Sequence, residues 1–128
     1  MPTESPPTVV NRSTDSYVVT ALARGLDVLN CYRATSKLLG NGELALRTGL
    51  PKSTVARLAH MLTHLGYLTY DSAASEDGLG PETLLLGSLM LSKLTVRELA
   101  RLQMHKLADF SHGMVTLGVR SRLHMIYI

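Results

Sequence analysis

The chain has 128 residues and a formal net charge of +3, and 45% of its residues are hydrophobic, with one Phe and no Trp. This length suits one domain, or one small domain and a fragment, built on an aliphatic core. No window holds the roughly 18 uncharged apolar residues that span a bilayer, and the start, MPTESPPTVVNRSTD, lacks the pattern of a signal peptide. We therefore expect a cytoplasmic protein.

The sequence lacks motifs for catalysis and for metal binding. Cys31 is the one cysteine, which excludes an internal disulfide and a cysteine-based metal cluster. His60 and His64 have the i, i+4 spacing of two metal ligands on a helix, but no Glu follows His60 and no third ligand is evident. There is no phosphate-binding glycine loop, no nucleophile elbow and no carboxylate cluster with a neighbouring base. We expect no metal, no cofactor and no enzymatic activity.

The positive charge is concentrated in one block of the chain. Residues 17–70 carry six basic and two acidic side chains, whereas residues 71–128 carry six of each. A local basic excess of this kind is typical of a surface that binds phosphates.

The chain begins with a tail and a helix. Residues 1–16 contain three Pro and no apolar period, which predicts a disordered tail. From Tyr17 the pattern is helical, and Leu22, Leu26 and Leu29 fall on one face of the helix.

Two further helices meet at a tight turn. The first is predicted over residues 43–48, with Asn41 as its N-cap and Gly49 as the residue that ends it. The second is predicted over residues 51–65, with Pro51 in its first turn.

The helix over residues 51–65 has two chemically different faces. Its apolar stripe consists of Val55, Leu58, Ala59, Leu62 and Leu65. The opposite face carries Ser53, Arg57, His60 and His64, with Lys52 and Thr54 beside them. One face is therefore predicted to pack against the core, and the other to be polar, cationic and nearly free of acidic groups.

The next segment has the pattern of a wing. Gly66 ends the helix, residues 67–70 are predicted to form a strand, and residues 71–78 a polar loop. Leu79 is predicted to start a short return strand. A helix followed by such a hairpin is the arrangement of a winged helix.

The C-terminal part is predicted to contain two helices and two strands. Seven of the eleven residues 84–94 are apolar, which fits either ordinary core or, as we favour, a dimer surface. Thr95 and Glu98 are expected to form a capping box at the start of the next helix. Residues 114–119 and 123–128 are predicted to form strands around Arg120-Ser121-Arg122.

The central block resembles the isocitrate lyase regulator (IclR) family of bacterial transcription factors. The resemblance lies in residues 43–58, ELALRTGLPKSTVARL, followed by Leu62 and Gly66-Tyr67-Leu68. It extends to Ala23-Arg24-Gly25-Leu26, Leu79-Gly80-Pro81 and Arg97-Glu98-Leu99-Ala100. It implies a dimer on a palindromic operator and, in full-length relatives, a GAF-like domain that binds a small-molecule effector.

The chain departs from the family pattern in its wing and in its length. The loop Asp71-Ser-Ala-Ala-Ser-Glu-Asp is acidic, which weakens the expected grip of the wing on DNA. The chain stops after the first hairpin of the effector domain. Two strands supply one wall of a ligand pocket, so we do not expect this chain to bind an effector.

The physical case for DNA binding rests on the helix over residues 51–65. A major groove admits one α-helix, whose N-terminal residues reach the bases in helix-turn-helix proteins. Arg57 can bond a guanine edge bidentately, and Lys52, Ser53 and Thr54 can bond phosphates. The resemblance implies that Arg24, in the first helix, contacts the DNA backbone. The predicted DNA-binding residues are Arg24, Lys52, Ser53, Thr54, Arg57 and His60.

We therefore predict a mainly α-helical chain with four parts: a disordered tail (1–16), a winged helix-turn-helix (17–81), a linker and dimerisation helix (82–94) and an incomplete α/β effector piece (95–128). The predicted dimerisation residues are Leu85, Leu86, Leu89 and Met90. The predicted function is sequence-specific transcriptional regulation by a DNA-binding dimer. The alternative is a winged-helix protein-interaction module that has lost DNA binding.

Overall fold

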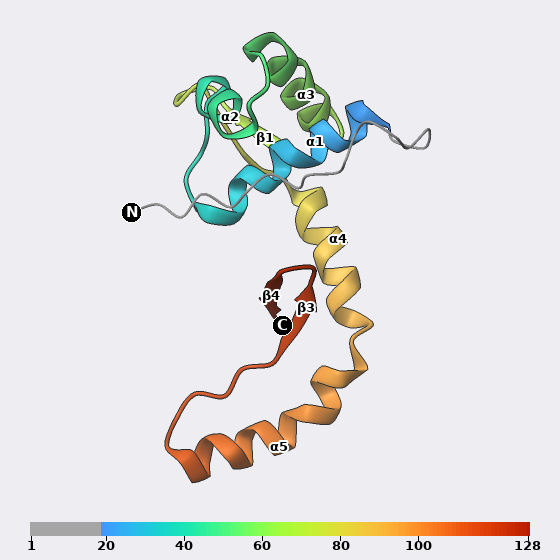
Figure 1. Cartoon of the computed structure of the whole chain (residues 1–128), viewed down its shortest axis with the longest axis vertical. Coiled ribbons are helices and arrows are strands. Elements are labelled where there is room, and N and C mark those ends of the chain that lie inside the picture. The colour runs from blue at the N-terminus through green and yellow to red at the C-terminus, as the bar shows by residue number, and fades with distance from the viewer. Residues whose placement is uncertain (1–18) are drawn as a thin grey trace. The chain divides into compact units, whose positions relative to one another are not determined.

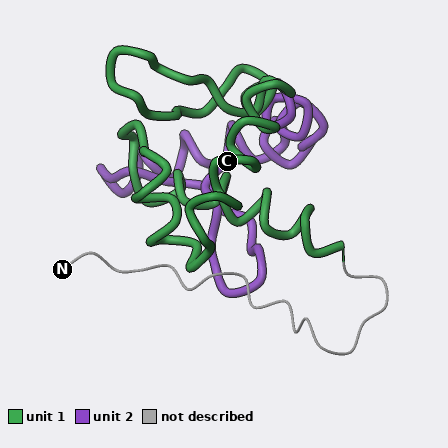
Figure 2. The backbone as a smooth tube through the Cα atoms, turned by 90° about the horizontal axis from the view of Figure 1, so that it is seen from above, with its two compact units in different colours: residues 1–84 green, residues 85–128 purple. Residues whose placement is uncertain are grey.

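The computed structural model describes residues 19–128 (Figure 1). The predicted tail over residues 1–16 lies outside the described residues. The chain divides into two compact units, residues 1–84 and 85–128, coloured separately in Figure 2. The division falls inside helix α4.

The first unit consists of helices followed by a hairpin. Its elements are α1 (Thr20–Asn30), the 3-10 helix η1 (Cys31–Ala34), α2 (Asn41–Thr48), α3 (Lys52–His64), β1 (Leu68–Asp71) and β2 (Glu76–Leu79). The strands are antiparallel, and their register runs from the pair Leu68↔Leu79 to the pair Asp71↔Glu76. This is the predicted winged helix-turn-helix.

One aliphatic cluster holds these elements together. Its buried members are Val28, Tyr32, Leu39, Leu44, Val55, Ala59 and Leu68. Each helix of the first unit and strand β1 contribute at least one side chain. Burying a Val or Leu side chain stabilises a fold by about 1.5–3 kcal/mol, so this shared cluster fixes α3 against α1 and α2.

The leucine face of α1 is only partly the side that packs. Leu22 and Leu26 are 63% and 51% exposed, whereas Val28 is fully buried. Val28 and, one turn later, Tyr32 face the core, and Leu29 packs against the same cluster. The leucine period was correct as a helical signal, but it only partly identified the side that packs.

The turn between α2 and α3 was predicted correctly at its centre and missed by one or two residues at its edges. Gly49 ends α2 with φ of 69°, a left-handed conformation that glycine adopts without strain. Asn41 does not cap α2; it is the first helical residue, and Gly40 precedes it as the N-cap without a side-chain bond. Pro51 is likewise the N-cap of α3 rather than part of its first turn.

The wing hairpin is longer than predicted. Strand β2 begins at Glu76 and ends at Leu79, so the expected start of the return strand at Leu79 is wrong. Leu39 explains the difference, because it forms a bridge to Asp77 through two backbone hydrogen bonds of 2.9 Å. The Asp71 carboxylate accepts hydrogen bonds from two backbone amides of the turn and closes it.

Two glycines let the wing return to the helices. Gly66 follows α3 with φ of 83°. A Cβ atom at Gly80 would collide with the carbonyl oxygen of Gly66. The close approach of these two backbone segments therefore requires glycine at position 80.

The remaining elements are α4 (Pro81–Ser92), α5 (Thr95–Ser111), β3 (Gly118–Ser121) and β4 (His124–Tyr127). The strands pair antiparallel, from Gly118↔Tyr127 to Ser121↔His124. The turn is Arg122-Leu123, so it lies one residue later than the predicted centre at Ser121. The predicted capping box is also wrong, because Leu94 is the N-cap of α5 and no side chain bonds there.

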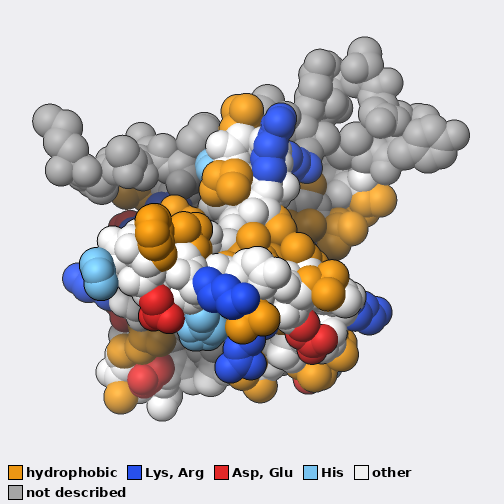
Figure 3. All heavy atoms as spheres, turned by 90° about the horizontal axis from the view of Figure 1, so that it is seen from below, with side chains coloured by type: hydrophobic (Ala, Val, Ile, Leu, Met, Phe, Trp, Pro, Cys, Tyr) orange, Lys and Arg blue, Asp and Glu red, His pale blue; other side chains and the backbone are white. Residues whose placement is uncertain are grey.

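Much apolar surface is exposed in the second unit. No residue of α4 or α5 is buried, and Figure 3 shows hydrophobic side chains at the surface beside Lys and Arg. Within residues 19–128 no helix is long and apolar enough to cross a membrane.

Candidate nucleic-acid interface

Helix α3 separates a core face from a solvent face. Val55 and Ala59 are buried, whereas Lys52, Ser53 and Arg57 are exposed. His60 is also exposed, and Thr54 is half-buried. Leu65, expected in the core stripe, follows the end of the helix and is 48% exposed.

A groove runs between α1 and α3. It has a volume of about 540 Å³ and is lined by Ala21, Arg24, Thr54, Arg57, Leu58, His60 and Met61. Four of the six predicted DNA-binding residues therefore line one surface feature, although Arg24 is 30 residues before Thr54 in the sequence. Lys52 and Ser53 lie outside the groove, at the exposed first turn of α3.

Arg24 carries an unsatisfied hydrogen-bond donor. Its Nε atom is buried and has no hydrogen-bond partner among residues 19–128. A buried donor without a partner costs about 1–3 kcal/mol. Arg24 also lines the groove, and a guanidinium forms charge-assisted hydrogen bonds with anion oxygens.

The groove and the adjoining first turn of α3 carry positive charge, and α3 has no acidic side chain to neutralise it. The first turn of α3 contains no acidic residue, and the partial positive charge of a helix N-terminus adds to that of Lys52. Not every cation of the basic block is free for a ligand, however. Arg47 forms an ion pair of 2.7 Å with Glu43 and donates to the carbonyl oxygen of Cys31.

The wing has the opposite charge. Asp71 and Glu76 are direct cross-strand neighbours at its tip, and residues 66–92 contain no Lys or Arg. Tyr70 is exposed on the same strand. A hairpin of this composition repels phosphates rather than attracting them.

Other reactive groups do not assemble into a second site. Burial raises the pKa of the Cys31 thiol, which donates to the Asp27 carbonyl oxygen at 3.3 Å. A raised pKa leaves the thiol protonated and unreactive. In the part of the chain that the structure describes, no three His, Cys, Asp or Glu side chains are grouped to hold a metal ion.

Sequence reasoning missed three residues of the groove: Ala21, Met61 and Leu58, which it had assigned to the core stripe alone. Met61 lies four residues after Arg57 and one after His60, so a helical projection of α3 could have found it. Ala21 could not be found in this way, because its place depends on how α1 packs against α3.

A cluster of three helices, with a tight turn between the second and third and a two-stranded hairpin after them, defines a winged helix-turn-helix domain. Residues 21–72 match the family model of the IclR helix-turn-helix domain. This part of the chain is an IclR-type helix-turn-helix domain, as the sequence suggested, and the curated relatives that the chain matches are named as regulators.

Two relatives match this chain over most of its length. The HTH-type transcriptional regulator TsaQ1/TsaQ2 of Comamonas testosteroni is 39% identical over 111 residues, which is 87% of this chain and 40% of that protein. The crystal structure of an IclR family regulator from Brucella abortus is 45% identical, with a TM-score of 0.83, over 95% of this chain and 46% of that one.

A more distant structure shares the fold alone. An IclR homolog from Microbacterium hydrocarbonoxydans, crystallised as a complex with 4-hydroxybenzoate, has a TM-score of 0.67 at 22% identity, over 84% of this chain and 45% of that one. The chain thus spans less than half the length of these relatives.

Proposed function

We propose that this chain binds double-stranded DNA sequence-specifically and thereby regulates transcription in the cytoplasm. The observation that carries the proposal is the groove between α1 and α3, which Arg24, Arg57 and His60 line together. A site of this kind suits a phosphate of the DNA backbone, next to a helix whose exposed face can enter the major groove.

The residues of α3 have different roles in this proposal. Arg57 is exposed in the second turn and reads a guanine edge through two parallel hydrogen bonds. Lys52 and Ser53 bond phosphates at the helix N-terminus, and Thr54 and His60 bond them from the groove. Arg24 anchors the phosphate that fixes the position of α1 on the duplex.

The helices and the acidic wing of the first unit contribute unequally to DNA affinity in this proposal. Because Asp71 and Glu76 repel phosphates, affinity comes from α1 and α3 rather than from the wing. The same acidity is the one observation that favours a protein-interaction module instead. The cations that line the α1–α3 groove, Arg24 and Arg57, support DNA binding over this alternative, because a protein-binding hairpin does not need them.

The proposal includes a homodimer on a palindromic operator. Leu85, Leu86, Leu89 and Met90 are all exposed in α4. A helix that is apolar on all sides is normally covered by other protein, and a second copy of α4 would cover it. Two-fold symmetry of the dimer would then match the two half-sites of a palindrome.

The test is selection of duplexes from a random pool by the immobilised chain, followed by binding measurements on the enriched sequence. We expect enrichment of a two-fold symmetric motif and preferential binding of it over a shuffled duplex of the same composition. A pool that shows no enriched motif would remove the proposal of sequence-specific binding.

A further inference from the structure

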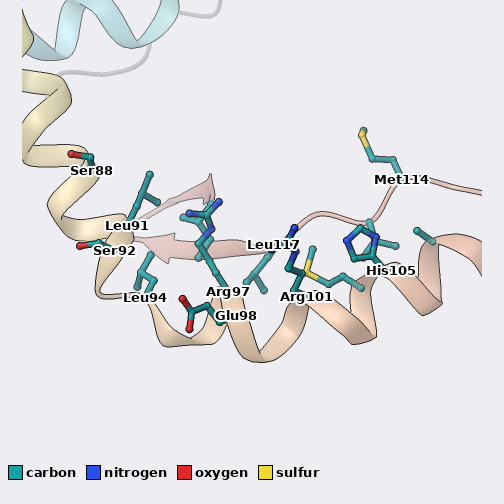
Figure 4. A pocket seen from close by; sticks show the side chains of 14 residues that line it. Ser88, Leu91, Ser92, Leu94, Arg97, Glu98, Arg101, His105, Met114 and Leu117 are labelled. Carbon is teal, nitrogen blue, oxygen red and sulfur yellow. The ribbon is translucent and has the colours of Figure 1, made fainter.

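Charged side chains also gather outside the α1–α3 groove. One such place is a hollow of about 920 Å³ in the second unit, lined by Arg97, Glu98 and Arg101 of α5 (Figure 4). Helices α4 and α5 and the segment 114–117 contribute to it, whereas sequence reasoning expected one wall from the strands alone. The hollow lies in the unit for which the family resemblance already implies an effector domain. Another place is the start of α2, in the first unit.

The wing strand β2 lies against the residues that lead into α2. Leu39 and Asp77 are bridged by two backbone hydrogen bonds of 2.9 Å, so the next residue of the chain, Gly40, lies opposite Glu76. A Cβ atom at Gly40 would be 3.8 Å from Cγ of the half-buried Glu76. The Glu76 side chain therefore lies against the N-cap residue of α2.

Positive charge meets this acidic side chain from two sources. Gly40 provides no side-chain cap, so the first amides of α2 keep the partial positive charge of a helix N-terminus. Lys52 of α3 lies over the same turn, because a Cβ atom at Gly42 would be 3.7 Å from its Cε and 3.8 Å from its Nζ. The ammonium group of Lys52 thus adds to the positive end of α2.

Glu76 is a carboxylate that can balance this charge. Glu43, in the first turn of α2, is engaged in the ion pair of 2.7 Å with Arg47. Within residues 19–128 no direct ion pair joins Glu76 to Lys52. The glycines that these two side chains touch are two residues apart, so their Cα atoms are separated by at most about 7.6 Å. The two charges therefore interact at low ionic strength, where the Debye length is about 30 Å at 0.01 M salt.

We propose, resting on the proposed function in which Lys52 bonds a phosphate, that Glu76 is an affinity-determining residue of the DNA-binding unit. It balances the positive charge of Lys52 and of the start of α2, and so lowers the affinity of α3 for every duplex. A phosphate bound to Lys52 also comes near Glu76, and the carboxylate opposes it. Such an internal counter-charge limits sequence-independent binding, which comes from phosphate contacts.

The experiment compares Glu76→Gln with the parent chain in two measurements that should change in opposite directions. In fluorescence anisotropy at about 10 mM salt, the variant should bind both the selected and the shuffled duplex about two- to fivefold more tightly, the range for exposed charge pairs. Its melting temperature without DNA should fall by a few degrees, because the carboxylate no longer complements the N-terminus of α2. A residue with a structural role alone would lower both the affinity and the melting temperature.

Asp71→Asn is the matched control. It removes one charge from the cross-strand neighbour of Glu76 and keeps an oxygen that accepts from the turn amides. Because β2 separates Asp71 from the residues before α2, this variant should change the affinity less and the melting temperature little. In a Lys52→Ala background, Glu76→Gln should raise the affinity by a smaller factor than in the parent, because the charge that Glu76 balances is gone.

A Glu76→Gln variant that binds duplexes no more tightly than the parent, or that melts at the same temperature, would overturn this role of Glu76. An equal gain in the parent and Lys52→Ala backgrounds, or an equal gain from Asp71→Asn, would overturn it too. A parent chain that binds no duplex would instead remove the proposed function itself.

Discussion

The hydroxyl of Tyr32 donates a hydrogen bond of 2.9 Å to the carbonyl oxygen of Asp77, 45 residues later in the chain. Leu39 donates to the same oxygen at 2.9 Å. Both bonds are buried with the core cluster, so they join η1 and the segment before α2 to strand β2 of the wing. The wing thus holds its position through a core contact rather than through its own two strands.

Removing the Tyr32 hydroxyl should loosen this connection. We expect Tyr32→Phe to lower the free energy of unfolding by about 0.5–1.5 kcal/mol, since Leu39 still satisfies the Asp77 carbonyl oxygen. Urea unfolding followed by circular dichroism measures the change. Tyr70→Phe removes an exposed hydroxyl and is the matched control. Equal stability of the Tyr32 variant and the parent would mean that the bond contributes nothing to stability.

Stability should also depend on the Asp77 carboxyl. Burial raises its pKa above the usual value of 3.8. A raised folded-state pKa means that Asp77 favours folding when protonated, and this contribution is lost as the pH rises through the folded pKa. Asp77→Asn keeps the shape of the side chain without the buried charge, so the variant should melt at a higher temperature than the parent at pH 7.

The difference between Asp77→Asn and the parent should shrink as the pH falls toward 3.8, because the parent carboxyl then becomes neutral too. Asp109→Asn, an exposed position of α5, should change the melting temperature little at any pH. A destabilised Asp77→Asn variant at pH 7 would show that the charge of Asp77 is favourable in the folded state.

Base recognition should depend on the geometry of Arg57, and not only on its charge. Arg57→Ala should cost about 1–3 kcal/mol of affinity for the selected duplex and relax specificity at one position. Arg57→Lys should lose the specificity but keep much of the affinity for random DNA, because an ammonium cannot bond bidentately.

Lys52→Ala should weaken binding to all sequences alike and reduce the salt slope by about one unit. Arg33→Ala, an exposed cation of η1 outside the groove, is the control and should change neither quantity. Fluorescence anisotropy with selected and shuffled duplexes measures both. Parent-like binding by a combined Arg57→Ala and Lys52→Ala variant would mean that α3 is not the recognition helix.

Sequence reasoning predicted the features that depend on local chemistry. The left-handed Gly49 and the burial of Val55 and Ala59 follow from spacing and residue type alone. The missed features depend on distant partners. The backbone bridge from Leu39 to Asp77 lengthens strand β2 beyond the predicted start at Leu79. Val28, rather than Leu22, is buried in the core. The clustering of Arg24 with Thr54 and Arg57 also depends on how α1 packs against α3.

Association should depend on the apolar surface of α4. Leu86→Glu with Leu89→Glu, at positions 61% and 52% exposed, should convert the proposed dimer into a monomer. The helical content should not change, because neither side chain is part of the core cluster. Leu46→Glu, at a highly exposed position of α2, is the control and should leave the assembly unchanged. Sedimentation velocity measures the mass, and a parent chain that is monomeric at tens of micromolar would contradict the proposed dimer.

The most direct test of the central claim, that α1 and α3 bind the DNA backbone, is the salt dependence of binding to the selected duplex. Between about 50 and 200 mM salt, log K should fall linearly with log salt concentration, with a slope near −0.9 for each phosphate contacted. Arg24→Ala should reduce the size of this slope by about one unit. A flat dependence, or an unchanged slope in both Arg24→Ala and Lys52→Ala, would contradict the account.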